Sequence, residues 1–293
     1  MTQKNNIDGI LLLDKPLKMS SNQAIQRIKK KFNIKKLGHT GTLDPLATGL
    51  LPVCMGRATR ISQFLIDSDK TYQAKIKLGV KTSTGDKEGE IIETSSVDNS
   101  HDSLSIDQID QVLQSFVGNQ EQIPPMYSAL KQNGKRLYKL ALKGVDVPRK
   151  ARSIQIYSIR LLSNNKEYLE LVIECSKGTY IRTLAEDIAN NLGTVGHIDE
   201  LRRLDIKCFD ISQMQSFDKI MDSNTIDQYL LPIDGPLKHL MKVDVNKSES
   251  KMFMNGLPIS VDQLSIEDSD YIRVYDDETR FLGLGTYLEG CIR

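Results

Sequence analysis

The chain has 293 residues, enough for about two domains of ordinary size. Its 39 lysines and arginines nearly balance its 38 aspartates and glutamates, and 39% of its residues are hydrophobic, as in a globular protein with a sizeable core. No apolar run approaches the ~18 residues that span a bilayer, and the short run 10–13 follows polar residues. We therefore expect no membrane segment and no signal peptide, and a cytoplasmic location.

The N-terminal third predicts a strand, a helix and a loop. Residues 9–14 are typical of a short buried strand. The capping box Ser20-x-x-Gln23 predicts the start of a helix that buries one face and presents basic residues on the others. Residues 38–49, rich in Gly, Thr and Pro, predict a loop.

Strands and helices alternate irregularly through the rest of the chain. A second capping box, Ser105-x-x-Gln108, predicts a helix that stops at Gly118, and a further helix is expected from about residue 181 to Gly193. The segment 231–236 predicts a linker. The expected strands are 72–80, 90–93, 154–162, 168–175, 271–275 and 280–287.

Metal-ligating residues are scattered. Cys54, Cys175, Cys208 and Cys291 show no C-x-x-C spacing, and the four histidines are equally dispersed. A structural zinc site needs clustered thiolate and imidazole ligands, so we expect no metal. A disulfide framework is unexpected in a chain of this size, and the cysteines are interpreted as small buried apolar side chains.

The near-zero net charge conceals strong local patterning. Residues 27–36 carry six basic residues and no acid, and residues 131–152 carry eight basic residues against Asp146 alone. By contrast, residues 86–110 hold eight acids against Lys87. Such runs are often merely solvated surface, but two of them in a neutral protein also suit a polyanion, which binds through phosphate neutralisation.

The segment 38–49, GHTGTLDPLATG, concentrates the candidate chemistry. Its glycines allow tight backbone geometry, and Pro45 holds the preceding Asp44 on an extended or turn backbone. A phosphate-cradling loop would continue with Lys-Ser/Thr, which is absent. The residues alone leave open an ordinary turn in which Asp44 is a local cap.

This segment and the upstream 9–16, GILLLDKP, closely resemble the TruB family of tRNA pseudouridine synthases. The resemblance continues in family order over most of residues 9–205. The further matching blocks are 67–72 (DSDKTY), 123–131 (IPPMYSALK), 147–149 (VPR), 175–182 (CSKGTYIR) and 201–204 (LRRL).

The resemblance implies an α+β pseudouridine-synthase fold, with a mixed, mainly antiparallel central sheet flanked by helices and loops. It implies a catalytic domain over 1–236, with a basic thumb-like insertion at about 124–152, and a small β-rich PUA-like RNA-binding domain over 237–293. The implied enzyme isomerises uridine 55 in the T loop of tRNA to pseudouridine, with no cofactor or metal. The expected partner is the tRNA T stem-loop, and we expect a monomer.

Four catalytic residues follow from the resemblance. Asp44 matches the essential carboxylate, and Arg182 matches its cationic neighbour, which should hold the Asp44 pKa down. Tyr72 matches the aromatic residue that stacks on the flipped base and assists proton removal from carbon 5, and Tyr180 matches a second aromatic that positions Asp44. Whether Asp44 attacks the sugar or acts through a glycal-like intermediate stays open.

The resemblance also implies residues that bind the RNA or substrate. His39 matches a residue that enters the RNA, Leu204 lies in the block near the uracil pocket, and Asp86 matches an acidic residue of the active site, although Ser83 stands where many relatives have Asp. The basic insertion should contact phosphates without reading sequence. The expected RNA- or substrate-binding residues are Lys15, His39, Asp86, Lys135, Lys139, Lys143, Arg149 and Leu204.

Three other functions remain open at this point. A non-catalytic tRNA-binding protein or tRNA folding chaperone would use the same scaffold. A glycoside hydrolase with Asp44 as nucleophile needs a partner carboxylate, and none is marked nearby. A basic structural adaptor would not require the glycine-rich loop.

Overall fold

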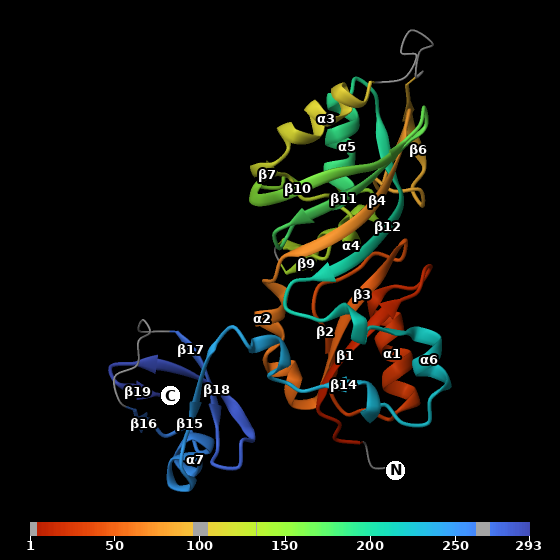
Figure 1. The fold of residues 1–293 in the computed structure, drawn as a ribbon. Coiled ribbons are helices and arrows are strands. Elements are labelled where there is room, and N and C mark those ends of the chain that lie inside the picture. Colours follow the sequence, from red (N-terminus) through yellow and green to blue (C-terminus); the bar gives the residue numbers. More distant parts are fainter. Residues whose placement is uncertain (1–4, 96–104, 133, 262–269) are drawn as a thin grey trace. The chain divides into compact units, whose positions relative to one another are not determined.

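The computed structural model describes residues 5–95, 105–132, 134–261 and 270–293 (Figure 1). The chain divides into two compact units, one ending at Leu231 and the other beginning at Pro232. This division falls inside the segment 231–236 that the sequence predicts as a linker. Part of the acidic stretch 86–110 lies outside the described residues, and in the described part no helix is long and apolar enough to cross a membrane.

Helices and strands alternate along both units. The α-helices are α1 (Ser21–Lys31), α2 (Ser62–Ile66), α3 (Ile106–Ser115), α4 (Leu137–Ala141), α5 (Ile181–Asn191), α6 (Phe217–Asp222) and α7 (Lys247–Met254). The strands of the first unit are β1 (Gly9–Lys15), β2 (Leu37–His39), β3 (Ala47–Met55), β4 (Lys70–Leu78), β5 (Val80–Thr82), β6 (Ile91–Thr94), β7 (Gly118–Gln122), β8 (Lys131–Gln132), β9 (Lys135–Arg136), β10 (Arg152–Asn164), β11 (Tyr168–Cys175), β12 (Gly196–Ile206), β13 (Gln215–Ser216) and β14 (Leu230–Leu231). Those of the second unit are β15 (Met241–Asp244), β16 (Ile259–Ser260), β17 (Tyr271–Tyr275), β18 (Phe281–Leu288) and β19 (Cys291–Ile292).

The described part of the first unit is built on a ten-stranded sheet in the order β13-β1-β3-β12-β4-β11-β10-β7, with β14 paired to β1 and β2 paired to β3. The pairs β1–β13 and β3–β12 are parallel, and the remaining pairs are antiparallel. Helices α1 and α6 lie beside β1 and β3, α3 lies beside β10, and α5 packs against β12 and β4 (Figure 1). The predicted α+β class with a mixed, mainly antiparallel sheet is confirmed.

Helix α1 forms where the capping box predicts it. The Ser20 hydroxyl accepts a hydrogen bond from the Gln23 backbone N–H, and the Gln23 side chain accepts one from the Ser20 N–H, which satisfies two free donors of the first turn. Ala24, Ile25 and Ile28 are buried against the sheet. The basic residues therefore remain on the outer faces, as the spacing predicts.

The strands predicted at 154–162 and 168–175 are also present, as antiparallel β10 and β11. Alternate residues of β11, among them Leu171 and Ile173, enter the core, while Glu170 and Glu174 point to the other face. This period of two is the pattern of a strand with one buried face.

The predicted loop 38–49 is shorter than the composition indicates. Strand β2 ends at His39 and β3 begins at Ala47, so only residues 40–46 form the loop. Strand β3 extends to Ala47 because residues 47–49 pair in parallel with residues 201–203 of β12. That pairing joins segments about 150 residues apart, and local sequence does not report such distant partners.

The face of the sheet opposite α5 carries paired charges. Lys75 lies 3.1 Å from Glu200, and Arg202 forms a two-pronged ion pair with Asp14 at 2.7 and 3.0 Å. A cavity of about 380 Å³ on this face is lined by the same lysine, glutamate and arginine. Lys75, Glu200 and Arg202 each already have an ion-pair partner, so these three charges are not free to bind a ligand.

The second unit has its own sheet, in the order β15-β17-β18-β19-β16, and its own small core, which includes Ile272, Val274 and Ile292. The strands predicted at 271–275 and 280–287 correspond to β17 and β18. Gly285 is required in β18 because a Cβ there would lie 2.3 Å from the Ile292 side chain. The predicted small β-rich C-terminal domain is confirmed as a fold.

Gly49 permits the close approach of β12 to β3. Its φ is +97°, and a Cβ there would lie 2.2 Å from the Arg203 carbonyl oxygen.

This close approach predicts different stability losses for two glycine variants. In Gly193→Ala, at φ +78° with open space around it, we expect the free energy of unfolding to fall by about 1–2 kcal/mol from the left-handed backbone alone. Gly49→Ala should lose a further ~1–3 kcal/mol from the backbone clash. Urea unfolding of both variants measures the difference, and equal losses would contradict the close approach.

Candidate active site

Asp44 lies in the loop between β2 and β3, and the residue before it is anchored to the start of α1. The Ser21 hydroxyl accepts a hydrogen bond from the Leu43 N–H at 2.8 Å and donates one to the Leu43 carbonyl at 2.9 Å. The Ala47 N–H in turn donates to the Asp44 carbonyl at 3.0 Å. The backbone on both sides of Asp44 is therefore fixed, which limits the directions that its carboxylate can take.

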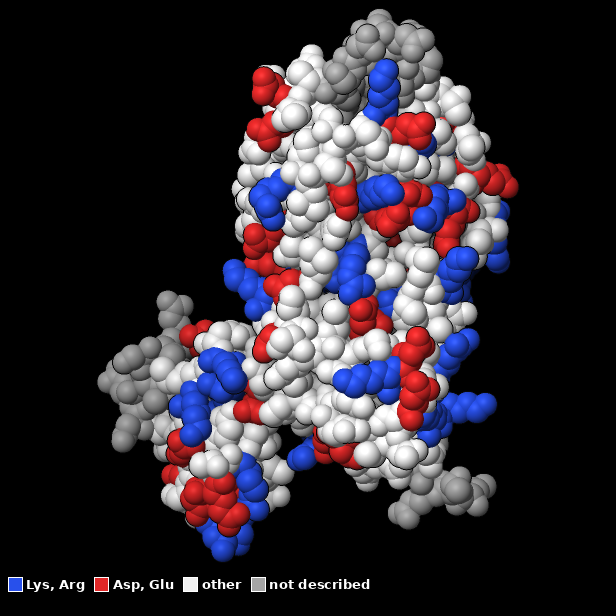
Figure 2. All heavy atoms as spheres, turned by 45° about the vertical axis from the view of Figure 1, so that its right-hand side comes forward, with Lys and Arg blue, Asp and Glu red and all other residues white. Residues whose placement is uncertain are grey.

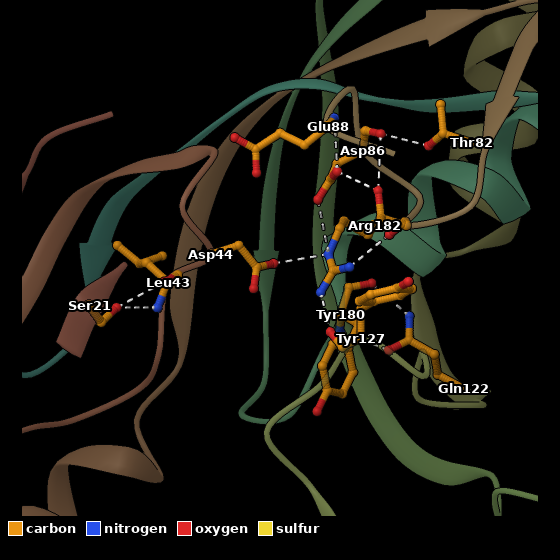
Figure 3. Close-up of polar contacts among 11 residues, drawn as sticks. Ser21, Leu43, Asp44, Thr82, Asp86, Glu88, Gln122, Tyr127, Tyr180 and Arg182 are labelled. Atoms are coloured by element: carbon orange, nitrogen blue, oxygen red, sulfur yellow. Dashed lines mark hydrogen bonds and ion pairs between the residues drawn. The ribbon is translucent and has the colours of Figure 1, made fainter. Parts of the chain in front are cut away.

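Arg182, the second residue of α5, points its guanidinium at that carboxylate (Figure 3). Its Nε lies 2.9 Å from Asp44 Oδ2, Nη1 donates to the Thr84 carbonyl at 2.7 Å, and Nη2 donates to the Tyr127 carbonyl at 2.7 Å. The side chain is only 6% exposed. One buried cation thus joins the Asp44 loop, the turn after β5 and the base of the segment 124–152.

Asp86 supports Arg182 from the other side. Its Oδ2 lies 4.0 Å from Arg182 Nε, while Oδ1 accepts hydrogen bonds from the Thr84 hydroxyl at 2.6 Å and from the Glu88 N–H at 3.1 Å (Figure 3). These bonds hold the turn so that the Thr84 carbonyl meets the guanidinium. Asp86 therefore acts by holding the backbone group that contacts Arg182. Its side chain is only 8% exposed, which leaves little surface for a ligand.

The pKa of Asp44 is raised above its ordinary value of 3.8, because burial of the carboxylate outweighs the attraction of Arg182. The family resemblance predicts the opposite, that the cation holds the pKa of Asp44 down. Arg182 does act in that direction, but desolvation is the larger influence even though 38% of the Asp44 side chain faces the open pocket. Without Arg182, the carboxyl would be still harder to ionise.

The pocket that Asp44 faces has a volume of about 250 Å³. All four residues predicted as catalytic line it, namely Asp44, Tyr72, Tyr180 and Arg182. They come from the loop, from β4 and from the start of α5, so only the folded chain brings them together. Leu201 of β12 adds an apolar wall.

Gln122 holds Tyr180 in place, and sequence reasoning missed it. The Gln122 side chain accepts a hydrogen bond from the Tyr180 N–H at 2.8 Å and donates one to the Tyr180 carbonyl at 3.0 Å (Figure 3). Tyr180 is the N-terminal cap residue of α5, and Arg182 lies in the first turn of the same helix. The polar strand GNQEQ gives no signal that its last residue is buried.

Two buried cations near the pocket were missed as well. Arg203 is 1% exposed and Lys70 is 7% exposed, and both line the pocket. Both lie in blocks that carry the family resemblance, 201–204 and 67–72. Their chemistry was not recognised because charged residues on a strand normally indicate its solvent face.

None of the eight residues predicted to bind substrate or RNA is among the residues that line the pocket. Lys15 is fully buried and donates to the Pro16 and Met19 carbonyls, and burial lowers its pKa to about 8. His39 is half-buried on β2, where burial and then Arg203 lower its pKa. Leu204 falls outside the lining, while Leu201 and Arg203 of the same block enter it, as strand alternation requires.

The basic segment 124–152 contains strands β8 and β9 and helix α4. Lys135, Lys139 and Lys143 are exposed and make no ion pair within the part of the chain that the structure describes. Arg149 differs, because it lies 3.3 Å from Asp146 and donates to the Pro124 carbonyl at 3.4 Å. The three lysines are thus available to a phosphate backbone, whereas Arg149 already has partners.

Among the described residues, no group of three or more His, Cys, Asp and Glu side chains is arranged to hold a metal ion. The charged and aromatic groups that line the pocket are one carboxylate (Asp44), the arginine paired with it (Arg182), two further cations (Lys70 and Arg203) and three tyrosines (Tyr72, Tyr127 and Tyr180).

Comparison with known proteins places this chain in a family. Residues 29–181 match the TruB family pseudouridylate synthase N-terminal domain, residues 182–238 the tRNA pseudouridylate synthase B C-terminal domain, and residues 242–293 the C-terminal domain of pseudouridine synthase II TruB. The chain belongs to the TruB family of pseudouridine synthases, which confirms the predicted resemblance.

Individual relatives agree with this placement. The chain is 46% identical over 285 residues to the tRNA pseudouridine synthase B of Chromohalobacter salexigens, which covers 97% of this chain and 91% of the relative. It is 44% identical over 284 residues to the protein of the same name from Methylobacillus flagellatus, with 96% and 92% covered. Among solved structures, one described as a Cbf5-Nop10-Gar1 complex matches with a TM-score of 0.70 at 26% identity, covering 96% of this chain and 78% of that one.

The two hydrogen bonds between Gln122 and Tyr180 predict a test of the site's framework. Gln122→Ala should lower the free energy of unfolding by about 1–3 kcal/mol, because both backbone groups of Tyr180 lose a buried partner. Gln120→Ala on the same strand is the control, since Gln120 contacts only two carbonyls, at 3.2 and 3.4 Å. Urea unfolding measures both, and a loss in Gln122→Ala no larger than in the control would contradict this role.

Proposed function

We propose that this protein converts uridine 55 in the T loop of tRNA to pseudouridine, with Asp44 as its essential catalytic group. The observation that carries the proposal is the Asp44–Arg182 ion pair at 2.9 Å in a pocket that Tyr72 and Tyr180 also line. Membership of the TruB family and relatives named tRNA pseudouridine synthase B support the choice of tRNA as substrate. Such a substrate implies a cytoplasmic location.

The reaction is an isomerisation. The bond between ribose carbon 1′ and uracil nitrogen 1 breaks, the uracil turns within the pocket, carbon 5 forms the new bond to carbon 1′, and the proton leaves carbon 5 while nitrogen 1 gains one. Asp44 either attacks carbon 1′ or acts through a glycal-like intermediate, and both routes need it ionised. Arg182 keeps the carboxylate charged and aimed.

Tyr72 is best suited to hold the flipped base. Its side chain is 8% exposed at the pocket wall, and an aromatic platform of this kind contributes about 1–3 kcal/mol to holding a base. Burial raises its pKa above the ordinary 10.0, an effect that the nearby Arg203 guanidinium opposes. The hydroxyl therefore stays protonated at neutral pH, which favours stacking over removal of the carbon 5 proton.

The other functions are less well supported. A glycoside hydrolase needs a second carboxyl group free to act as acid and base, and Asp86 is occupied by Thr84, Glu88 and Arg182. A tRNA-binding protein or folding chaperone without catalysis has no use for a carboxylate held in the pocket by a buried arginine. The monomeric state stays a prediction.

Asp44→Asn should abolish pseudouridine formation while leaving tRNA affinity nearly unchanged, because the amide keeps the shape of the side chain but not its charge. Unmodified tRNA is incubated with each protein, and pseudouridine is mapped by position and counted, with affinity from filter binding. Asp199→Asn, on the opposite face of the sheet, is the control and should retain full turnover. Turnover by Asp44→Asn near the wild-type rate, or wild-type product at another position, would refute the proposal.

The basic segment predicts a second result. Positive and negative side chains are interspersed on the face shown in Figure 2. For binding the phosphate backbone of tRNA, a local group of unpaired lysines therefore matters more than the net charge of the protein. Replacing Lys135, Lys139 and Lys143 together by Gln should weaken tRNA binding and flatten its dependence on salt, because fewer counterions are released. A matched variant, Lys75→Gln with Lys87→Gln, removes lysines that are already paired with acids. An unchanged salt slope in the triple variant would remove this segment from the interface.

A further inference from the structure

Among the described residues that are fully buried, Arg203 has the largest side chain, and the proposed chemistry gives it no task. It lies on β12 and is 1% exposed. Within the described residues, no carboxylate lies within ion-pair distance of its guanidinium. Burying an unpaired charge is unfavourable for folding, so a packing role alone does not explain an arginine here.

Backbone carbonyls take the place of a carboxylate. Arg203 Nε donates to the Leu50 carbonyl at 2.6 Å, and Nη2 donates to the Gly41 carbonyl at 3.1 Å. Gly41 and Leu50 lie on either side of the segment that contains Asp44. One planar guanidinium therefore ties both ends of that segment to the sheet, with a fixed distance between its two donors.

The backbone is shaped to admit this side chain. Gly41 has a φ of +78°, and a Cβ there would lie 3.2 Å from Arg203 Nη1. Gly49 pairs with Arg203 across β3 and β12, and a Cβ on Gly49 would clash with the Arg203 backbone. Two of the glycines that characterise the loop thus adjoin the same arginine.

The guanidinium also adjoins Tyr72. The two residues are register partners on β12 and β4, and both line the pocket that Asp44 faces. Arg203 therefore contacts the supports of the carboxylate and the proposed platform for the base at the same time.

Resting on the proposed function, we propose that Arg203 is a positioning residue, which fixes the ends of the Asp44 loop and the Tyr72 side chain in the geometry that the isomerisation needs. Its action passes through Gly41, Leu50 and Tyr72 rather than through the uridine. Loss of Arg203 should then slow the chemical step and leave the binding of tRNA, which depends on surfaces outside the pocket, largely intact.

The neighbouring Arg202 supplies a matched control. It belongs to the same strand, but its side chain points to the opposite face, where it pairs with Asp14. The variants are Arg203→Met, Arg203→Lys and Arg202→Met, in the full chain. Lysine retains the charge but cannot reach both carbonyls with the same geometry, so it should recover part of the rate that methionine loses.

Single-turnover rates on unmodified tRNA and dissociation constants from filter binding separate chemistry from affinity. Arg203→Met releases both ends of the Asp44 loop, and the resulting misplacement of the carboxylate should lower the single-turnover rate about 100-fold. We expect an intermediate rate for Arg203→Lys and a wild-type rate for Arg202→Met. The dissociation constants should stay close to that of the wild type. A wild-type rate in Arg203→Met, or a loss of affinity in proportion to the rate, would overturn the proposal.

Amide hydrogen exchange of residues 41–46, measured without RNA, gives a readout independent of activity. Exchange should be faster in Arg203→Met and unchanged in Arg202→Met. If wild-type protein makes no pseudouridine, the proposed function fails, while this exchange pattern still decides the role of Arg203 in fixing the loop. If both Arg203 variants are unfolded under conditions where Arg202→Met is folded, Arg203 serves folding alone and the proposal is wrong.

Discussion

The ion pair between Asp44 and Arg182 is the interaction on which the rest of the site depends. Burial makes the carboxylate costly to ionise, and the guanidinium offsets part of that cost while it also fixes the direction of the carboxyl group. An exposed aspartate would ionise freely but would be surrounded by water and free to rotate. In the observed pair the half-buried carboxylate has a raised pKa, but the buried arginine holds its negative charge in a fixed position beside the pocket.

Arg182 connects this charge to distant parts of the chain. Its remaining donors bind the Thr84 and Tyr127 carbonyls, so the turn after β5 and the base of the segment 124–152 are both held by the residue that holds Asp44. A change in the position of either segment therefore acts on the direction of the carboxylate. This arrangement links the proposed RNA-contacting lysines, which follow Tyr127 in the chain, to the proposed catalytic group through one side chain.

Local signals in the sequence predict much of the fold. The capping boxes place α1 and α3, and alternation in β11 identifies its buried face, because both depend on residues within a few positions of one another. Strand β12 was missed because it carries charges on both faces and is defined by distant partners, β3 and β4. For the same reason, the resemblance identified the four catalytic candidates but not Gln122 or Arg203, whose roles consist of hydrogen bonds to backbone groups far along the chain.

The central claim is that Asp44 is a half-buried carboxylate kept ionisable by Arg182, and a direct titration of that carboxyl group tests it. Carbon-13 NMR of aspartate-labelled protein, assigned by comparison with Asp44→Asn, gives its pKa in the wild type and in Arg182→Gln. The account predicts a pKa above the ordinary 3.8 in the wild type and a further increase when the arginine is removed, because the charged form then loses its partner. A wild-type pKa at or below 3.8, or no increase in Arg182→Gln, would contradict it.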